Sequence, residues 1–158
     1  MDFWNIFKNN ASSLNRKGLK ELKRGNRHAA LKYFNKAIEI KPQSDIIRFN
    51  RAKTLWEIGK SYEAIKEYDK VLDLNPKHAW AWFNLGVIIS DMGRPEEALE
   101  FLNKSLEYEP KHANTWYLIG ITLKKLKRSR EAVECVEMAF SLDPALQREF
   151  EELSENYL

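Results

Sequence analysis

The sequence predicts an all-α solenoid, a row of stacked helical hairpins, because two series of residues share one period. Four prolines and three glycines each recur at intervals of 34 residues. A fixed period of this size is typical of a solenoid built from stacked units. The prolines are Pro42, Pro76, Pro110 and Pro144, and the glycines are Gly25, Gly59 and Gly93, with Lys127 at the next place in the glycine series.

Each unit is predicted to hold two helices around a short break, and the third unit shows this best. Its apolar residues Trp82, Leu85 and Ile89 recur at helical spacing and form one stripe. Gly93 then ends the first helix, and Pro110 ends the unit because the residue before a proline disfavours the helical region. Division at the prolines gives four repeats, over residues 11–44, 45–78, 79–112 and 113–146.

Two segments lie outside these units. Residues 147–158 carry Phe150, Leu153 and Tyr157 at helical spacing, which predicts a C-terminal helix that caps the apolar face of the fourth unit. Residues 1–10 crowd four large apolar side chains together. They form either a partial helix that caps the first unit or a free hydrophobic arm.

Composition limits the kinds of protein that the chain can be. It has 158 residues, of which 44% are hydrophobic and 31% charged, so a soluble folded chain is expected. A single cysteine excludes an internal disulfide framework and a multi-cysteine zinc site. No apolar run is long enough to cross a bilayer, and the N-terminus lacks the pattern of a signal peptide. We therefore expect a cytoplasmic protein that does not bind membranes.

The units resemble the tetratricopeptide repeat (TPR), whose pattern is W-x2-L-G-x2-Y, then A-x3-F, then P. The resemblance is strongest in the last two units and extends over residues 11–146. It implies a right-handed superhelix, no catalytic activity, and a scaffold that binds proteins in a concave groove. The matching residues are Trp82, Leu85, Gly86, Ile89, Ala98, Leu102 and Pro110 in the third unit, and Trp116, Ile119, Gly120, Leu123, Ala132, Val136 and Pro144 in the fourth.

In this family the first helix of each unit lines the concave groove. The resemblance implies a set of groove-lining positions in this chain, which we call the groove residues. Most are aromatic or aliphatic, which favours an apolar or amphipathic peptide segment as the ligand. They are Asn15, Leu19, Phe49, Asn50, Lys53, Trp56, Trp80, Phe83, Asn84, Val87, Tyr117, Ile121 and Lys124.

The five tryptophans divide by position. Trp82 and Trp116 fill the motif slot and are predicted to pack in the core. Trp56 and Trp80 occupy variable slots, where an exposed ring is a candidate recognition anchor. Trp4 lies in the unassigned N-terminal segment.

Co-chaperone members of the family offer a more specific comparison. They clamp a C-terminal carboxylate with asparagine and a cationic pair. Here Asn50 matches, but Trp80 and Asn84 stand where the cations would be, so a chaperone-tail clamp is not favoured. The sequence Asn50-Arg51-Ala52 resembles their second repeat, which implies a structural Arg51 that pairs with a carboxylate such as Glu21 or Glu39.

No catalytic, metal-binding or cofactor site is expected. His78 and His112 occupy equivalent turns near helix starts, and no phosphate-binding loop occurs. Cys135 lies among acidic residues, which raise a thiol pKa and oppose nucleophilic chemistry.

Charge leaves two alternatives to the peptide-binding hypothesis. The net charge is only +3, but residues 14–36 hold eight basic residues against one acidic, while residues 147–158 hold four acidic residues against one basic. Opposite charges at the two ends, or the N-terminal arm, favour a self-associating scaffold, either head-to-tail or through the arm. A nucleic-acid-binding helical repeat is the third hypothesis, which the small net charge does not favour.

Overall fold

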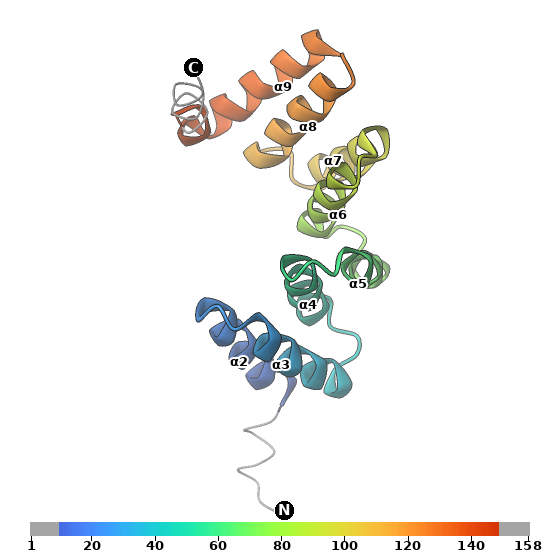
Figure 1. Cartoon of the computed structure of the whole chain (residues 1–158), viewed down its shortest axis with the longest axis vertical. Helices are drawn as coiled ribbons and strands as arrows, with labels where there is room; N and C mark the ends of the chain where they lie inside the picture. Colours follow the sequence, from blue (N-terminus) through green and yellow to red (C-terminus); the bar gives the residue numbers. More distant parts are fainter. Residues whose placement is uncertain (1–9, 149–158) are drawn as a thin grey trace, which may run out of the picture. The chain divides into compact units, whose positions relative to one another are not determined.

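The computed structural model of the chain describes residues 10–148, and these residues form an all-α fold (Figure 1). The predicted N-terminal arm and most of the predicted capping helix lie outside the described residues. Residues 144–148 are helical. Eight helices lie wholly within the described residues: α2 (Ala11–Lys23), α3 (Arg27–Ile40), α4 (Asp45–Glu57), α5 (Ser61–Leu74), α6 (Ala79–Asp91), α7 (Pro95–Tyr108), α8 (Ala113–Lys125) and α9 (Ser129–Leu142).

Local chemistry accounts for where these helices begin and end. The Asn10 side chain accepts a hydrogen bond of 2.7 Å from the Ser13 N–H and so caps α2. Pro95 begins α7. The glycines of the 34-residue series end the first helix of three hairpins with φ between 77° and 82°. Lys127 takes the same place after α8 with φ 61°, a region that favours glycine.

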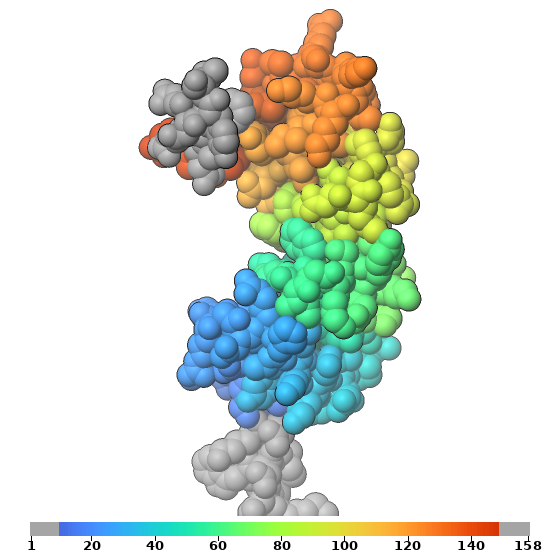
Figure 2. Space-filling view, viewed as in Figure 1, coloured from blue at the N-terminus to red at the C-terminus, as the bar shows by residue number. Residues whose placement is uncertain are grey.

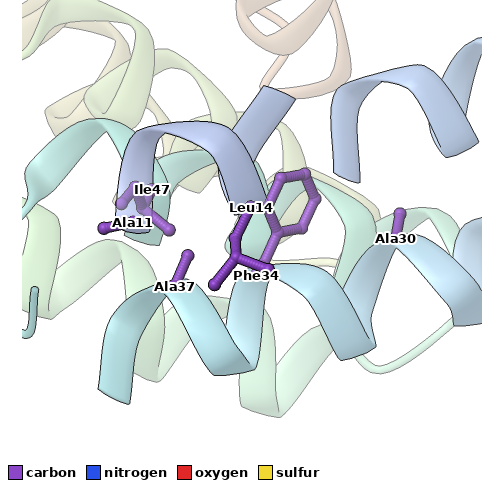
Figure 3. Packing of buried hydrophobic residues seen from close by; sticks show 6 residues of the cluster. All are labelled: Ala11, Leu14, Ala30, Phe34, Ala37 and Ile47. Carbon is purple, nitrogen blue, oxygen red and sulfur yellow. The ribbon is translucent and has the colours of Figure 1, made fainter. Parts of the chain in front are cut away.

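The chain divides into two compact units after Ala81, within α6. In the first unit α2 packs on α3, α3 on α4, and α4 on α5. A buried cluster joins α2, α3 and α4, with the Phe34 ring at its centre (Figure 3). In the space-filling view the residues of α2 and α3, drawn in blue, form one continuous surface (Figure 2). The cluster consists of Ala11, Leu14, Ala30, Phe34, Ala37 and Ile47.

In the second unit α7 packs on α8 and α8 on α9. Its buried cluster takes residues from all three helices, and the Trp82 ring of α6 stacks on Phe101 of α7 at 6.0 Å. The cluster consists of Leu99, Leu102, Ile119, Leu123 and Ala132. The covering of α7 by α8 thus buries Leu99 and Leu102.

Small residues let the two helices of a hairpin approach closely. A Cβ atom built on Gly18 would lie 2.5 Å from Cε1 of Phe34, and one on Gly120 would lie 2.6 Å from Cγ2 of Val136. Real side chains do not tolerate such distances. The glycine of the repeat motif therefore sets the spacing of the helices.

Two expectations about particular side chains need correction. Trp82 and Trp116 are only half-buried, and Nε1 of Trp116 donates a 2.8 Å hydrogen bond to the Pro110 carbonyl. An indole N–H needs an acceptor, which the turn before α8 supplies. Arg51 does bind a carboxylate, but its partner is Glu67, at 3.0 Å, rather than Glu21 or Glu39. The Glu21 carboxylate instead accepts from Arg24 and Asn26.

Within the described residues no helix is long and apolar enough to cross a membrane.

Candidate functional site

The groove residues lie on the first helices of the hairpins, α2, α4, α6 and α8. Asn15 and Leu19 are on α2, and Tyr117, Ile121 and Lys124 are on α8. On α6 the boundary between the two units separates Trp80, in the first unit, from Phe83, in the second. The remaining members on α4 are Phe49, Asn50, Lys53 and Trp56, and those on α6 are Asn84 and Val87.

In the first unit a hydrogen bond joins two groove residues from neighbouring first helices. Nδ2 of Asn50 donates to Oδ1 of Asn15 at 3.0 Å, and both side chains are half-buried. The backbone carbonyl of Asn50 also accepts a hydrogen bond of 2.7 Å from the hydroxyl of the buried Thr54, one turn further along α4. The two amides thus form a fixed polar contact between α2 and α4, with spare donors and acceptors.

Phe49 of α4 is held by two aromatic neighbours. Its ring meets Tyr68 edge-on at 5.8 Å and stacks on the His78 imidazole at 4.6 Å. The Ala81 N–H donates to Nδ1 of His78, so this imidazole caps the start of α6. Burial lowers the pKa of His78, although the nearby Asp45 carboxylate opposes the shift. His78 therefore acts as a structural turn residue.

The other groove residues of the first unit differ in exposure. Trp80 is 44% exposed and Leu19 is 38% exposed, which is high for such apolar side chains. Lys53 is also exposed, whereas Trp56 is half-buried.

In the second unit the groove residues of α6 are less accessible. Asn84 is buried, and Phe83 and Val87 are half-buried. The Phe83 ring meets the His112 imidazole edge-on at 5.1 Å. Burial lowers the pKa of His112, against the opposing charge of Glu109.

Three groove residues of α8 gather in one open pocket, which we call the α8–α9 pocket. It has a volume of about 340 Å³ and lies within a single helical hairpin. Its walls are mostly aliphatic and aromatic, with two charged side chains. Tyr117, Gly120, Ile121 and Lys124 come from α8, and Ser129, Ala132, Val133, Val136, Glu137 and Phe140 line it from α9 and its start.

The pocket residues of α9 are not among the predicted groove residues, because the resemblance places the groove on the first helices. Val133, Val136 and Phe140 recur at helical spacing on the second helix. This stripe is the feature of the sequence that predicts an apolar side of the pocket on α9.

The chemistry of these residues suits binding. Within residues 10–148 no cluster of three histidine, cysteine or carboxylate side chains could hold a metal ion. Burial, together with Glu131 and Glu134, raises the pKa of the Cys135 thiol and keeps it protonated. A protonated, half-buried thiol is a poor nucleophile.

Comparison with family models identifies the repeat. Tetratricopeptide repeat models match residues 59–120, and residues 11–44 and 113–146. Together the matches cover more than half of the chain. No curated protein sequence matches it.

Solved structures share the fold. MamA has 21% sequence identity and a TM-score of 0.80, over 89% of this chain and 82% of that one. YrrB, a TPR protein with an unusual peptide-binding site, has 21% identity and a TM-score of 0.72, over 85% and 69%. The first TPR of Spaghetti (RPAP3), bound to an HSP90 peptide, has 23% identity and a TM-score of 0.71, over 74% and 95%. At these identities the likeness shows the fold.

Proposed function

Because the chain belongs to the tetratricopeptide repeat family, we propose that it is a protein-interaction scaffold without catalytic activity. It comprises four repeats, over residues 11–44, 45–78, 79–112 and 113–146. Its groove residues bind an apolar or amphipathic segment of a partner protein, in extended or helical form.

The observation that carries this proposal is the α8–α9 pocket. Tyr117, Ile121 and Lys124, three residues expected to contact a ligand, line it together. Its volume of about 340 Å³ is at the lower end of the range typical of ligand pockets and suits one or two large side chains. The exposed Trp80 ring offers a second apolar anchor, in the first unit.

Two structural relatives support a peptide ligand. YrrB is described as having a peptide-binding site, and the RPAP3 repeat is bound to a peptide. Because the clamp positions of this chain hold no cationic pair, a chaperone tail is not the ligand that we propose.

The test is a selection of peptides from a random library displayed on phage, followed by affinity measurement. We expect Trp80→Ala or Ile121→Ala to weaken the selected peptides at least tenfold, about 1.4 kcal/mol, with the melting temperature retained. Tyr62→Ala and Met138→Ala are the matched controls, since both side chains are exposed, at 74% and 44%, and neither belongs to the groove residues. Unchanged affinity in both test variants would reject the groove assignment.

Self-association is a second candidate, which the charge on the α2–α3 hairpin favours. Arg24 pairs with Glu21, and Arg27 pairs with Glu57. Five further cations on this hairpin have no ion-pair partner among the described residues, and they can attract an acidic surface of another copy. They are Arg16, Lys20, Lys23, Lys32 and Lys36.

Sedimentation at low and high salt tests this second candidate. We expect oligomers at low salt that dissociate as salt screens the charges. If the chain is a monomer at both salt concentrations, the self-association hypothesis is rejected. Retention of the chain on RNA or DNA at low salt would instead support a nucleic-acid-binding repeat.

A further inference from the structure

One pair of side chains joins the two helices of a repeat at places that are equivalent along the 34-residue period. In the second repeat the pair is Arg48 of α4 and Glu67 of α5, which form an ion pair of 3.1 Å. In the third repeat it is Trp82 of α6 and Phe101 of α7, whose rings stack at 6.0 Å. The first member always comes from the first helix and the second member from the second helix.

In the fourth repeat the pair is Trp116 and Cys135. The first member is held as it is in the second repeat. Nε of Arg48 donates to the Pro42 carbonyl at 2.9 Å, and Nε1 of Trp116 donates to the Pro110 carbonyl at 2.8 Å. The second member is different, because cysteine is the shortest side chain that any of the four repeats has at this place.

A pocket of about 230 Å³, which we call the Trp116 pocket, lies at this short side chain. Trp116 and Leu123 of α8 line it, with Leu99 of α7 and Cys135 of α9. It belongs to the second unit alone, and its lining residues include none of the groove residues. The pocket is smaller than a typical small-molecule site, so it suits a single side chain. Because Phe101 stacks on a tryptophan at the equivalent place, an aromatic ring fits there.

The charged residues that line the Trp116 pocket leave one carboxylate for a ligand. Arg128 donates hydrogen bonds of 2.7 and 2.6 Å to the Glu131 carboxylate, so these two charges balance. Glu134 also lines the pocket, and its ion pair with Arg130 is long, at 3.6 Å, between two highly exposed side chains. An exposed pair of this kind contributes little free energy, so Glu134 can exchange it for a cation of a partner.

We propose that the Trp116 pocket is a second binding site, which takes an aromatic side chain that stands next to a lysine or arginine in a partner protein. The ring stacks on Trp116 as Phe101 stacks on Trp82, and the cation pairs with Glu134. This site goes beyond the proposed function and does not depend on it, because the two sites share no residue. The chain can therefore hold one partner segment at its groove residues and another at α7, α8 and α9.

The first test follows the binding of short probes to the full chain by NMR. The probes are acetylated dipeptide amides: phenylalanine–arginine, phenylalanine–glutamate and alanine–arginine. The indole signal of Trp116, assigned by its loss in Trp116→Phe, reports occupancy. We expect saturable binding of phenylalanine–arginine, binding about threefold weaker for phenylalanine–glutamate because the ion pair is lost, and none for alanine–arginine. The proposal is rejected if phenylalanine–arginine causes no saturable shift up to about 10 mM.

The second test fills the pocket with the side chain that the third repeat has. Cys135→Phe should weaken the binding of phenylalanine–arginine at least about tenfold while the melting temperature is retained. Cys135→Ala is the matched control, since it keeps the pocket open and should keep the affinity. If Cys135→Phe binds the dipeptide as tightly as the unaltered chain does, the ligand is not in this pocket.

A third measurement uses the unaltered chain, so it does not depend on how Cys135→Phe folds. Cys135 is the only cysteine of the chain, and it lines the pocket. When phenylalanine–arginine fills four-fifths of the sites, alkylation of Cys135 by a maleimide should slow about fivefold, because only the empty fraction reacts. The alanine–arginine dipeptide should not change the rate. Equal rates with and without bound phenylalanine–arginine would contradict the proposal.

The Ile121→Ala variant distinguishes this site from the groove residues. It should weaken the peptides that a library selects and leave the binding of phenylalanine–arginine unchanged. Dipeptide binding that is lost in Ile121→Ala and kept in Cys135→Phe would place the probe in the α8–α9 pocket and overturn the second site. If the library selects nothing while the dipeptide protects Cys135, the proposed function fails and the Trp116 pocket stands.

Discussion

At the scale of single residues, Glu67 of α5 shows how a helical repeat holds a buried charge. Its side chain is 4% exposed, and its carboxylate binds Arg48 at 3.1 Å, Arg51 at 3.0 Å and Lys70 at 2.8 Å. Burial alone would raise the pKa of Glu67, but the Lys70 hydrogen bond and the Arg51 charge outweigh it and lower the pKa below its usual value. The cluster therefore ties α4 to α5 with an ionised group.

Removal of this charge should destabilise the fold. We expect Glu67→Gln to lower the free energy of unfolding by about 2 kcal/mol at pH 7, because the half-buried side chains of Arg48 and Arg51 lose their counter-charge. Urea unfolding followed by circular dichroism measures the difference. Glu107→Gln is the control, since it breaks an exposed pair with Lys104 and should cost less than about 0.5 kcal/mol.

The pH dependence of this difference has a definite sign. A carboxyl whose pKa is lower in the folded state contributes stability above its unfolded pKa, about 4.3, and loses it as the pH falls through the folded value. The difference in free energy of unfolding between the unaltered chain and Glu67→Gln should therefore become smaller below about pH 4.3. If this difference in free energy of unfolding stayed constant down to pH 2, ionisation of Glu67 would not stabilise the fold.

At the scale of the helix and its turn, the fourth hairpin departs from the other three. Gly25, Gly59 and Gly93 turn the chain with positive φ at no steric cost, whereas Lys127 does so at φ 61° with a side chain. This strain lies in the connection between α8 and α9, beside the α8–α9 pocket.

Restoring glycine at this place should stabilise the hairpin. We expect Lys127→Gly to raise the free energy of unfolding by about 0.5–1 kcal/mol, as relief of the left-handed strain exceeds the added flexibility of the unfolded chain. Thermal melting compares it with Lys36→Gly, an exposed site within α3 where the same replacement should cost about 1 kcal/mol. Destabilisation by both replacements would show that the turn carries no strain.

At the scale of the whole molecule, the chain forms two compact units, and within each unit consecutive helices pack on one another. In such an array stability is nearly a sum of local terms, so a disturbance in one hairpin should stay near it. The α2–α3 hairpin and the α8–α9 hairpin, which lie in different units, are suited to a test.

We predict that Gly18→Ala acts locally. The new Cβ would overlap the buried Phe34 ring, at a cost of about 1–3 kcal/mol that helix propensity offsets by about 1 kcal/mol. Hydrogen exchange measured by mass spectrometry should accelerate in α2 and α3 and remain unchanged in α8 and α9. Arg16→Ala, two residues away and exposed, should leave all rates unchanged, and a uniform acceleration across the chain after Gly18→Ala would indicate a single cooperative unit.

The sequence by itself determined the helices, their pairing into hairpins and the family. These features depend on local rules: glycine where φ is positive, proline where a helix cannot continue, and apolar residues at helical spacing. Because each hairpin obeys the same rules, the period of 34 residues revealed all of them at once.

Only the tertiary structure decided which side chains meet across helices. Periodicity did not show that Arg51 binds Glu67, that Trp116 reaches the Pro110 carbonyl, or that α9 supplies most of the residues that line the α8–α9 pocket. These contacts depend on the rotation and spacing of two packed helices, which close contacts such as that of Gly120 with Val136 set. The pattern along one helix gives its apolar face, but the depth of a pocket depends on both helices together.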